Sequence, residues 1–286
     1  MALTPKIYTK KLGIVSRDYR KKEKNGYRDF SYAFKDILTI LDEQACDTVL
    51  FSLYTIEKRS SFNVKNFLNR LNISNIRIIC TEEFKDGNDR EFLEYVIYYY
   101  DKDQWKEHRL TQVFVKSQEV NTKQKNKMGY QFSSKALKKA ELFKKQVLED
   151  RLFGNFTILL CGETNIVSRK GKRVRKDLMK IKDPHKYRAL LDKDIRVIFN
   201  PIHDRMIRPE MLKGREYLSK NNRWVISVWN KGRADKNGRV VDYKSHDWTV
   251  YYNGEAKECE PLQFNVDSQA DIQIGIINLI GDAKFV

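Results

Sequence analysis

The residue best suited to chemistry in this sequence is Cys161, which directly follows the apolar run Phe156–Leu160. An unbroken apolar run of this length is typical of a strand buried on both faces, and Gly162–Asn165 is where such a strand would turn sharply. A tight turn exposes a thiol, and nearby amide N–H groups stabilise both a thiolate and an oxyanion. A free cysteine is also commonly a small buried hydrophobe. The decapeptide alone therefore leaves a nucleophile and a core thiol as alternatives.

The elements around Cys161 alternate between helices and strands. Strand, helix, strand at the start of the chain is a βαβ beginning, and the next unit repeats it, which predicts an α/β fold. We expect a hairpin between 92–100 and 112–115 with its turn at 101–103, an exposed loop over 120–134 and a basic loop over 168–182. Further strands are predicted at 12–16, 48–51, 76–80, 156–160, 195–200, 224–230, 247–252 and 272–279, and helices at 31–44, 64–71, 134–152 and 209–220.

The order of these elements resembles the nitrilase superfamily of carbon–nitrogen hydrolases, most clearly from Phe156 to Gly254. In that family a strand ends in the nucleophilic cysteine, with an acid two residues later, as in Cys161-Gly162-Glu163. A strand ending in Asn-Pro follows, comparable to Asn200-Pro201, and then a helix with an arginine, comparable to Arg215. A strand ending in Asn and Gly (Asn230, Gly232) and a closing strand before Asn253-Gly254 complete the series.

The resemblance implies a nitrilase-like four-layer α-β-β-α sandwich with mixed sheets, formed by a single domain over 1–286. It also implies an amidase-type reaction in which the cysteine forms a thioester that water then hydrolyses. No cofactor and no metal are expected. A homodimer is expected from the family habit alone.

The sequence departs from the family at the general base. The family has a Pro-Glu pair at the end of its second strand, where this chain has Ser52-Leu53, and leucine cannot move protons. Glu57 and Glu119 are candidate substitutes, although a surface glutamate is the simpler interpretation of Glu57. Because a general base contributes about two to four orders of magnitude, its absence would divide an active enzyme from an inactive scaffold.

The family's oxyanion-stabilising lysine has two candidates, Lys116 and Lys106. Lys116 is preferred because it closes an extended run as the family's lysine does, but a solvated lysine at a strand end fits equally well. His203 follows the Asn-Pro strand end and could line a pocket, yet a lone histidine beside Asp204 is more often part of a surface pair. The candidate catalytic set is Cys161, Lys116, Glu119, Glu57 and Glu163.

The net charge of +17 is concentrated in three windows. Residues 6–28 carry 9 Lys or Arg against 2 acids, 122–145 carry 8 against 1, and 168–188 carry 10 against 2, so the rest of the chain is net acidic. Clustered cations form polyanion-binding surfaces, and they also serve solubility alone. The candidate nucleic-acid-binding residues are Arg169, Lys170, Lys172, Arg173, Arg175 and Lys176.

The alternative function is therefore a nitrilase-like module without catalysis that binds nucleic acid or a protein through its basic loops. Nitrilase-like domains beside reverse transcriptases in bacterial antiviral systems suggest, by analogy, a reverse-transcriptase partner.

Composition adds further limits. Apolar runs are far shorter than a membrane span and the N-terminus lacks an apolar signal core, so the cytoplasm is the expected compartment. Four scattered cysteines without a CxxC pair indicate neither disulfides nor a zinc site.

Overall fold

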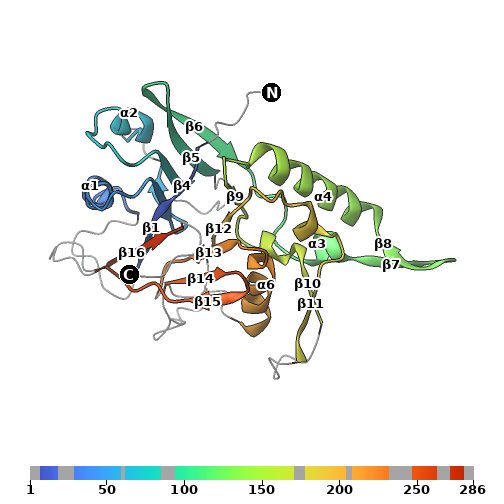
Figure 1. Cartoon of the computed structure of the whole chain (residues 1–286). Coiled ribbons are helices and arrows are strands. Elements are labelled where there is room, and N and C mark those ends of the chain that lie inside the picture. The colour runs from blue at the N-terminus through green and yellow to red at the C-terminus, as the bar shows by residue number, and fades with distance from the viewer. Residues whose placement is uncertain are drawn as a thin grey trace, which may run out of the picture.

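The chain is a mixed α/β protein, as its alternating pattern predicts (Figure 1). The computed structural model describes residues 7–18, 29–58, 62–84, 94–170, 178–203, 208–231, 247–262 and 271–279. None of the helices within these ranges is long and apolar enough to cross a bilayer.

The larger sheet gathers most strands of the N-terminal half and one strand from the C-terminal end. Its order is β16-β1-β2-β4-β5-β6, and the short β3 also pairs with β4. β1, β2 and β4 run parallel, whereas β16, β5 and β6 pair antiparallel with their neighbours. The bounds are β1 Lys11–Arg17, β2 Thr48–Phe51, β3 Ile56–Glu57, β4 Ile78–Phe84, β5 Glu94–Asp101, β6 Gln104–Leu110 and β16 Ile272–Asn278.

The second sheet has the order β15-β14-β13-β12-β9. β9, β12 and β13 are parallel, so their carboxyl ends lie at one edge of the sheet. The bounds are β9 Phe156–Ile158, β12 Val197–Pro201, β13 Trp224–Val228, β14 Trp248–Tyr252 and β15 Glu255–Lys257.

The two sheets pack against each other, and successive residues of each strand divide between different cores. Leu50 points into the core between the sheets, while its neighbours Val49 and Phe51 join the core on the outer side of the larger sheet. In the second sheet Phe199 points inward and Ile198 outward. This alternation follows from the two-residue period of a strand, and it explains why the strand sequences are apolar throughout.

Helices cover the outer faces of both sheets. α1 (Phe34–Glu43) and α2 (Val64–Leu68) pack on the larger sheet, and α4 (Ser134–Lys145) and α6 (Pro209–Ser219) pack on the second sheet, on opposite sides of the molecule in Figure 1. Shorter helical turns are α3 Gln118–Asn121, α5 Tyr187–Leu190, the π-helical η1 Gln146–Asp150 and the 3₁₀-helical η2 Glu163–Ile166.

Three segments differ from the sequence-based expectation. The partner of β5 is β6 and not 112–115, because Lys102 and Asp103 adopt left-handed φ values of 50° and 60°. Two such residues form a two-residue hairpin turn, and the return strand therefore begins at once. The expected loop over 120–134 contains the hairpin of β7 (Lys123–Asn126) and β8 (Gly129–Phe132). The expected basic loop contains the paired β10 (Ser168–Lys170) and β11 (Lys180–Lys182).

Candidate active site

Cys161 lies in a tight turn directly after β9. The Leu159 N–H still donates to the Phe199 carbonyl at 2.8 Å, and then the Glu163 N–H donates back to the Leu160 carbonyl at 2.9 Å. Gly162 has φ 82° and ψ −18°, which is the third position of a type II turn and places Cys161 second. A Cβ atom on Gly162 would lie 2.3 Å from the Val115 carbonyl oxygen. Only glycine fits there, so this turn fixes the position of the thiol.

Glu163 holds this turn in place from within the protein. Its carboxylate accepts the Leu160 N–H and the Val113 N–H, each at 2.8 Å, and forms a buried ion pair with Arg151 at 2.5 Å. Burial raises the pKa of Glu163, and Arg151 and the two backbone donors oppose that shift. With its oxygens occupied in this way, Glu163 is a positioning residue for Cys161.

His203 connects Cys161 to a carboxylate on the other sheet. The segment after β12 brings the imidazole to the thiol, and its Nε2 lies 2.9 Å from Glu82 Oε1. Glu82 is on β4 and is only 4% exposed. A cysteine, a histidine and a glutamate thus form one continuous contact across the two sheets, although they lie far apart in the sequence.

The electrostatics of His203 favour its charged form. Burial opposes a positive charge on the ring, but hydrogen bonds to Cys161 and Glu82 outweigh burial and raise its pKa well above the ordinary value. A protonated imidazole beside a sulfur stabilises the thiolate, which is the nucleophilic form of cysteine. No histidine of the described ranges acts on the other three thiols, and burial raises their pKa, to about 11 for Cys46 and about 12 for Cys259, and upward for Cys80 as well.

The segment after β2 orients Glu82. The Tyr54 N–H donates to Glu82 Oε2 at 2.7 Å, and the Glu82 N–H donates to Thr55 Oγ1 at 3.0 Å. Tyr54 has φ 60°, an unfavourable conformation for a bulky residue, and its ring lies 4.8 Å from the ring of His203. Backbone strain at Tyr54 therefore coincides with contacts to both His203 and Glu82.

Hydrogen bonds from asparagine side chains connect the strand ends near the site. Asn200 Nδ2 donates to the Leu159 carbonyl at 2.6 Å, and Ser227 Oγ donates to Asn200 Oδ1 at 3.0 Å. Asn230 Nδ2 donates to the Leu53 carbonyl at 2.8 Å and so links the second sheet to the larger one. The carboxyl ends of strands from both sheets consequently meet around Cys161.

The structure places the other proposed catalytic residues differently. Leu53, at the position of the family's base, is buried in the same core as Cys161. Glu57 is half-buried in β3, where its N–H donates to Asp29 at 2.6 Å, and no described contact joins it to Cys161. Glu119 forms an ion pair with Lys139, which lowers its pKa to about 2 and makes it a weak base.

Neither lysine candidate contacts the thiol among the described contacts. The backbone of Lys116 runs beside the cysteine turn, since the preceding Val115 carbonyl faces Gly162, but the Lys116 side chain is exposed. Lys106 pairs with Asp101 across the β5–β6 hairpin at 2.5 Å.

The predicted nucleic-acid-binding residues are only partly described. Arg169 is on β10 and faces α6, where it lies 3.9 Å from Glu210. Lys170 is on the same strand, and its side chain lies outside the described part. Lys172, Arg173, Arg175 and Lys176 lie outside the described residues.

Sequence reasoning missed the pairing of Glu82 with His203. The available signals were an acid two residues after the buried Cys80 and a histidine two residues after Asn-Pro. Glu82 lies within the last three residues of β4 and His203 follows β12, and only the packing of the two sheets brings them together.

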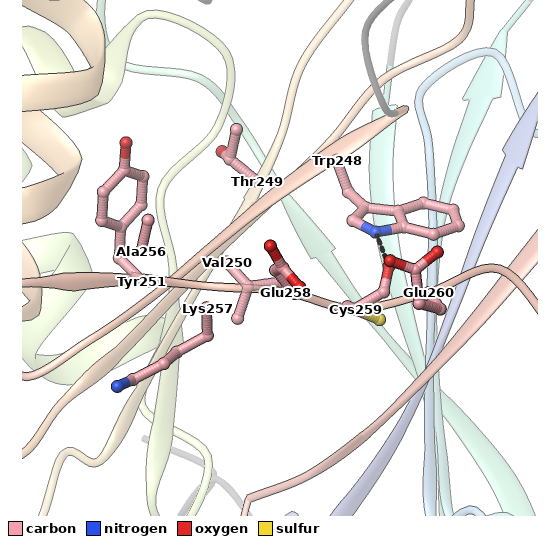
Figure 2. A pocket seen from close by; sticks show the side chains of 9 residues that line it. All are labelled: Trp248, Thr249, Val250, Tyr251, Ala256, Lys257, Glu258, Cys259 and Glu260. Carbon is pink, nitrogen blue, oxygen red and sulfur yellow. Dashed lines mark hydrogen bonds between the residues drawn. The ribbon is translucent and has the colours of Figure 1, made fainter.

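A separate surface hollow lies beside β14 and β15 (Figure 2). Its walls run from Trp248 to Tyr251 and from Ala256 to Glu260, and the Trp248 Nε1–H donates to the Cys259 carbonyl at 2.9 Å. Cys161, His203 and Glu82 are not part of its lining. The hollow is therefore distinct from the cysteine site.

Comparisons with known proteins give little beyond this geometry. No family model and no curated protein sequence matches the chain. Among solved structures, a glutamine-dependent NAD(+) synthetase from Cytophaga hutchinsonii is similar at 8% identity with a TM-score of 0.45, over 94% of this chain and 43% of the synthetase. An amidase from Nesterenkonia sp. is similar at 8% identity with a TM-score of 0.44, over 95% of this chain and 92% of the amidase. The chain thus spans less than half the length of the synthetase.

Proposed function

We propose that this protein is a cysteine hydrolase of the amidase type, in which Cys161 is the nucleophile, His203 the general acid and base, and Glu82 the residue that orients His203. The observation that carries the proposal is the position of the imidazole between the thiol and a buried carboxylate. A nucleophile, a base and an orienting acid in mutual contact form the arrangement by which acyl-transfer enzymes activate a weak nucleophile.

The reaction follows from these roles. The Cys161 thiolate attacks the amide carbonyl carbon, and the carbon–sulfur bond forms as negative charge moves to the oxygen. The carbon–nitrogen bond then breaks, and the leaving amine takes the proton held by His203. Water then attacks the thioester carbon and gives a proton to the neutral imidazole. The carbon–sulfur bond breaks, and the carboxylic acid leaves as the thiolate and the imidazolium are restored. Glu82 stabilises the imidazolium throughout and keeps its ring in position.

The choice of a carbon–nitrogen bond rests on the sequence resemblance to the nitrilase superfamily. Two sheets packed face to face, with helices on both outer faces, fit the α-β-β-α sandwich that the resemblance implies. The missing family glutamate at Leu53 is compensated in this proposal by Glu82 on the adjacent parallel strand, because β2 and β4 pair with Leu50 opposite Cys80.

Labelling with iodoacetamide near pH 7 tests the activated thiol. We expect one rapid label per chain, at Cys161, because His203 contacts this thiol and an adjacent imidazole activates a cysteine nucleophile. Cys161→Ala should abolish the rapid phase, and His203→Gln should slow it by about tenfold or more. Cys259→Ser is the matched control and should change nothing, since that half-buried thiol contacts no histidine in the described part of the chain.

A second measurement tests the acyl intermediate. With p-nitrophenyl acetate, the wild type should release a burst of about one p-nitrophenol per chain and carry an acetyl group on Cys161, detected by mass spectrometry. The proposal would be overturned if labelling persisted in Cys161→Ala, or if the rate of labelling were the same in His203→Gln as in the wild type.

One observation favours a second activity, the binding of nucleic acid. Phe132 of β8 stacks on His185 at 4.7 Å, and this contact joins the basic window 122–145 to the basic window 168–188. Lys125, Lys127, Lys180 and Lys182 are all exposed on the two hairpins. Exposed cations on neighbouring hairpins are the electrostatic requirement for holding a phosphate backbone. We infer that this hairpin surface, made of β7–β8 and β10–β11, binds nucleic acid.

A further inference from the structure

Arg215 on α6 is a buried cation that the proposed reaction leaves unexplained. Its side chain is 1% exposed, and its Nη1 donates to Thr249 Oγ1 at 2.9 Å. Its Nε and Nη2 are buried and have no hydrogen-bond partner among the described residues. An unpaired charge in the interior costs several kcal/mol, so a guanidinium with two open donors indicates a missing anionic partner.

Arg215 lies near the cysteine site, because α6 packs on η2, the turn that begins two residues after Cys161. Burial lowers the pKa of the guanidinium to about 10, and the charges of Tyr251 and Cys161 oppose this shift. The guanidinium carbon also lies 5.9 Å from the centre of the Trp229 ring. Arg215 thus lies beside an aromatic face and interacts electrostatically with the thiol and a tyrosine, while burial still dominates the shift of its pKa.

Two more arginines add to the positive charge here. Arg169 is close enough to Arg215 to lower its pKa further, and Arg208 acts on Arg169 in the same way. Glu210 is the acid between them, at 3.9 Å from Arg169 and 3.7 Å from Arg208. Together these three arginines and one glutamate carry a net positive charge, and this charge is present before any reaction begins. Such a charge suits a group that is anionic in the free substrate, and not only an oxyanion that forms briefly.

We propose that Arg215 binds a carboxylate of the substrate through its Nε and Nη2 donors, beside the carbonyl that Cys161 attacks. The fork of a guanidinium matches the two oxygens of a carboxylate, which is why arginine serves in such sites. The substrate class is therefore an amide that carries a free carboxylate near the scissile bond. This inference rests on the proposed function, since it assumes that Cys161 is the reacting thiol.

The test compares two alkylating agents of similar size, the anionic iodoacetate and the neutral iodoacetamide. Each forms a carbon–sulfur bond and releases iodide, so their rate ratio at Cys161 cancels the reactivity of the thiol itself. We expect the wild-type ratio to exceed that of free cysteine, and Arg215→Gln to lower it by about tenfold, the effect of losing a charge-assisted hydrogen bond. Lys213→Gln removes the same charge from the exposed side of α6 and should leave the ratio unchanged.

A second measurement covers the case in which Arg215→Gln does not fold. In the wild type, millimolar propionate should slow the labelling of Cys161 by iodoacetamide, and propionamide should not. Arg215→Lys should keep part of the iodoacetate preference, because lysine retains the charge without the fork. A ratio unaffected by both Arg215 substitutions, or equal protection by acid and amide, would overturn this inference. Rapid labelling that depends on His203 would still support the hydrolase, so the two proposals fail separately.

Discussion

At the scale of single residues, one imidazole distinguishes Cys161 from the other cysteines. Burial raises the pKa of the Cys46, Cys80 and Cys259 thiols. Among the described residues His203 is the histidine that hydrogen-bonds to a thiol, and Glu82 lies 2.9 Å from its ring nitrogen and stabilises its charge. In the proposed function, two residues outside the cysteine strand therefore distinguish Cys161 from a core thiol.

The raised pKa of His203 predicts a specific dependence of stability on pH. A raised folded-state pKa means that the charged ring stabilises the fold fully below the unfolded-state value of about 6.5. This contribution is lost as the pH rises through the folded-state pKa. We expect the difference in free energy of unfolding between the wild type and His203→Gln to be largest near pH 6 and to shrink toward pH 9, measured by urea denaturation.

His185 is the matched control with the opposite sign. Burial lowers its pKa, so protonation favours the unfolded chain, and the wild type should lose stability relative to His185→Gln as the pH falls below about 6.5. Parallel pH profiles for the two variants would contradict the assignment of His203 as the charged partner of Cys161.

At the scale of elements, the site depends on the turn that ends the cysteine strand. Gly162 supplies the left-handed conformation, and Glu163 returns to bind the Leu160 and Val113 N–H groups while it pairs with Arg151. Removing one member of a buried ion pair costs about 3–5 kcal/mol, so this carboxylate is strongly constrained. The acid two residues after the cysteine thus has a structural reason for its place.

Substituting the turn glycine should therefore destabilise the protein. In Gly162→Ala the new methyl group would meet the Val115 carbonyl oxygen at 2.3 Å in a strained left-handed conformation. We expect a loss of about 1–3 kcal/mol in the free energy of unfolding, together with slower labelling of Cys161. Gly129→Ala in the β7–β8 hairpin also has a positive φ, of 111°, but nothing lies within 4 Å of its Cβ position. Equal losses in both variants would show that backbone strain, and not the contact with Val115, dominates.

At the scale of the whole molecule, the basic hairpins and the candidate cysteine site both lie next to the second sheet. The β7–β8 and β10–β11 hairpins extend away from the sheets on the side of α4 and α6, whereas α1 and α2 lie across the molecule (Figure 1). The stacking of Phe132 on His185 fixes one hairpin against the segment that follows the other. A polyanion bound to these hairpins would lie beside the second sheet, and Cys161 and His203 directly follow two strands of that sheet.

This arrangement predicts salt-dependent nucleic-acid binding that maps to the hairpin surface. The double substitution of Lys125 and Lys182 by glutamate should weaken binding of a fluorescent single-stranded oligonucleotide, because two phosphate contacts are lost. Each lost contact should also reduce the slope of log affinity against log salt concentration by roughly one unit. Fluorescence anisotropy between about 50 and 200 mM salt measures both quantities. Reversing the exposed Lys35 and Lys65 on α1 and α2 is the matched control. Identical affinities for the two double variants would remove the proposed surface.

Much of the secondary structure follows from local patterns in the sequence. The apolar runs of β2, β12 and β13 are buried strands as predicted, and the helical spacing of Phe34, Ile37 and Leu41 forms the buried face of α1. The β5–β6 hairpin was misassigned because a two-residue turn depends on backbone conformation, which composition expresses weakly. The period of a strand or helix is a local property, and a single sequence therefore suffices to find it.

Some features of the candidate site follow from the sequence, and others follow only from the tertiary structure. The sequence by itself determined the position of Cys161 at a strand end and the glycine and acid that shape its turn, because these residues are neighbours in the chain. Only the tertiary structure decided that Glu82 and His203 meet at the thiol and that the buried Arg215 keeps two donors without a hydrogen-bond partner among the described residues. Contacts between sheets join residues more than a hundred positions apart, and the packing of side chains, which no local pattern encodes, sets which strand ends come together.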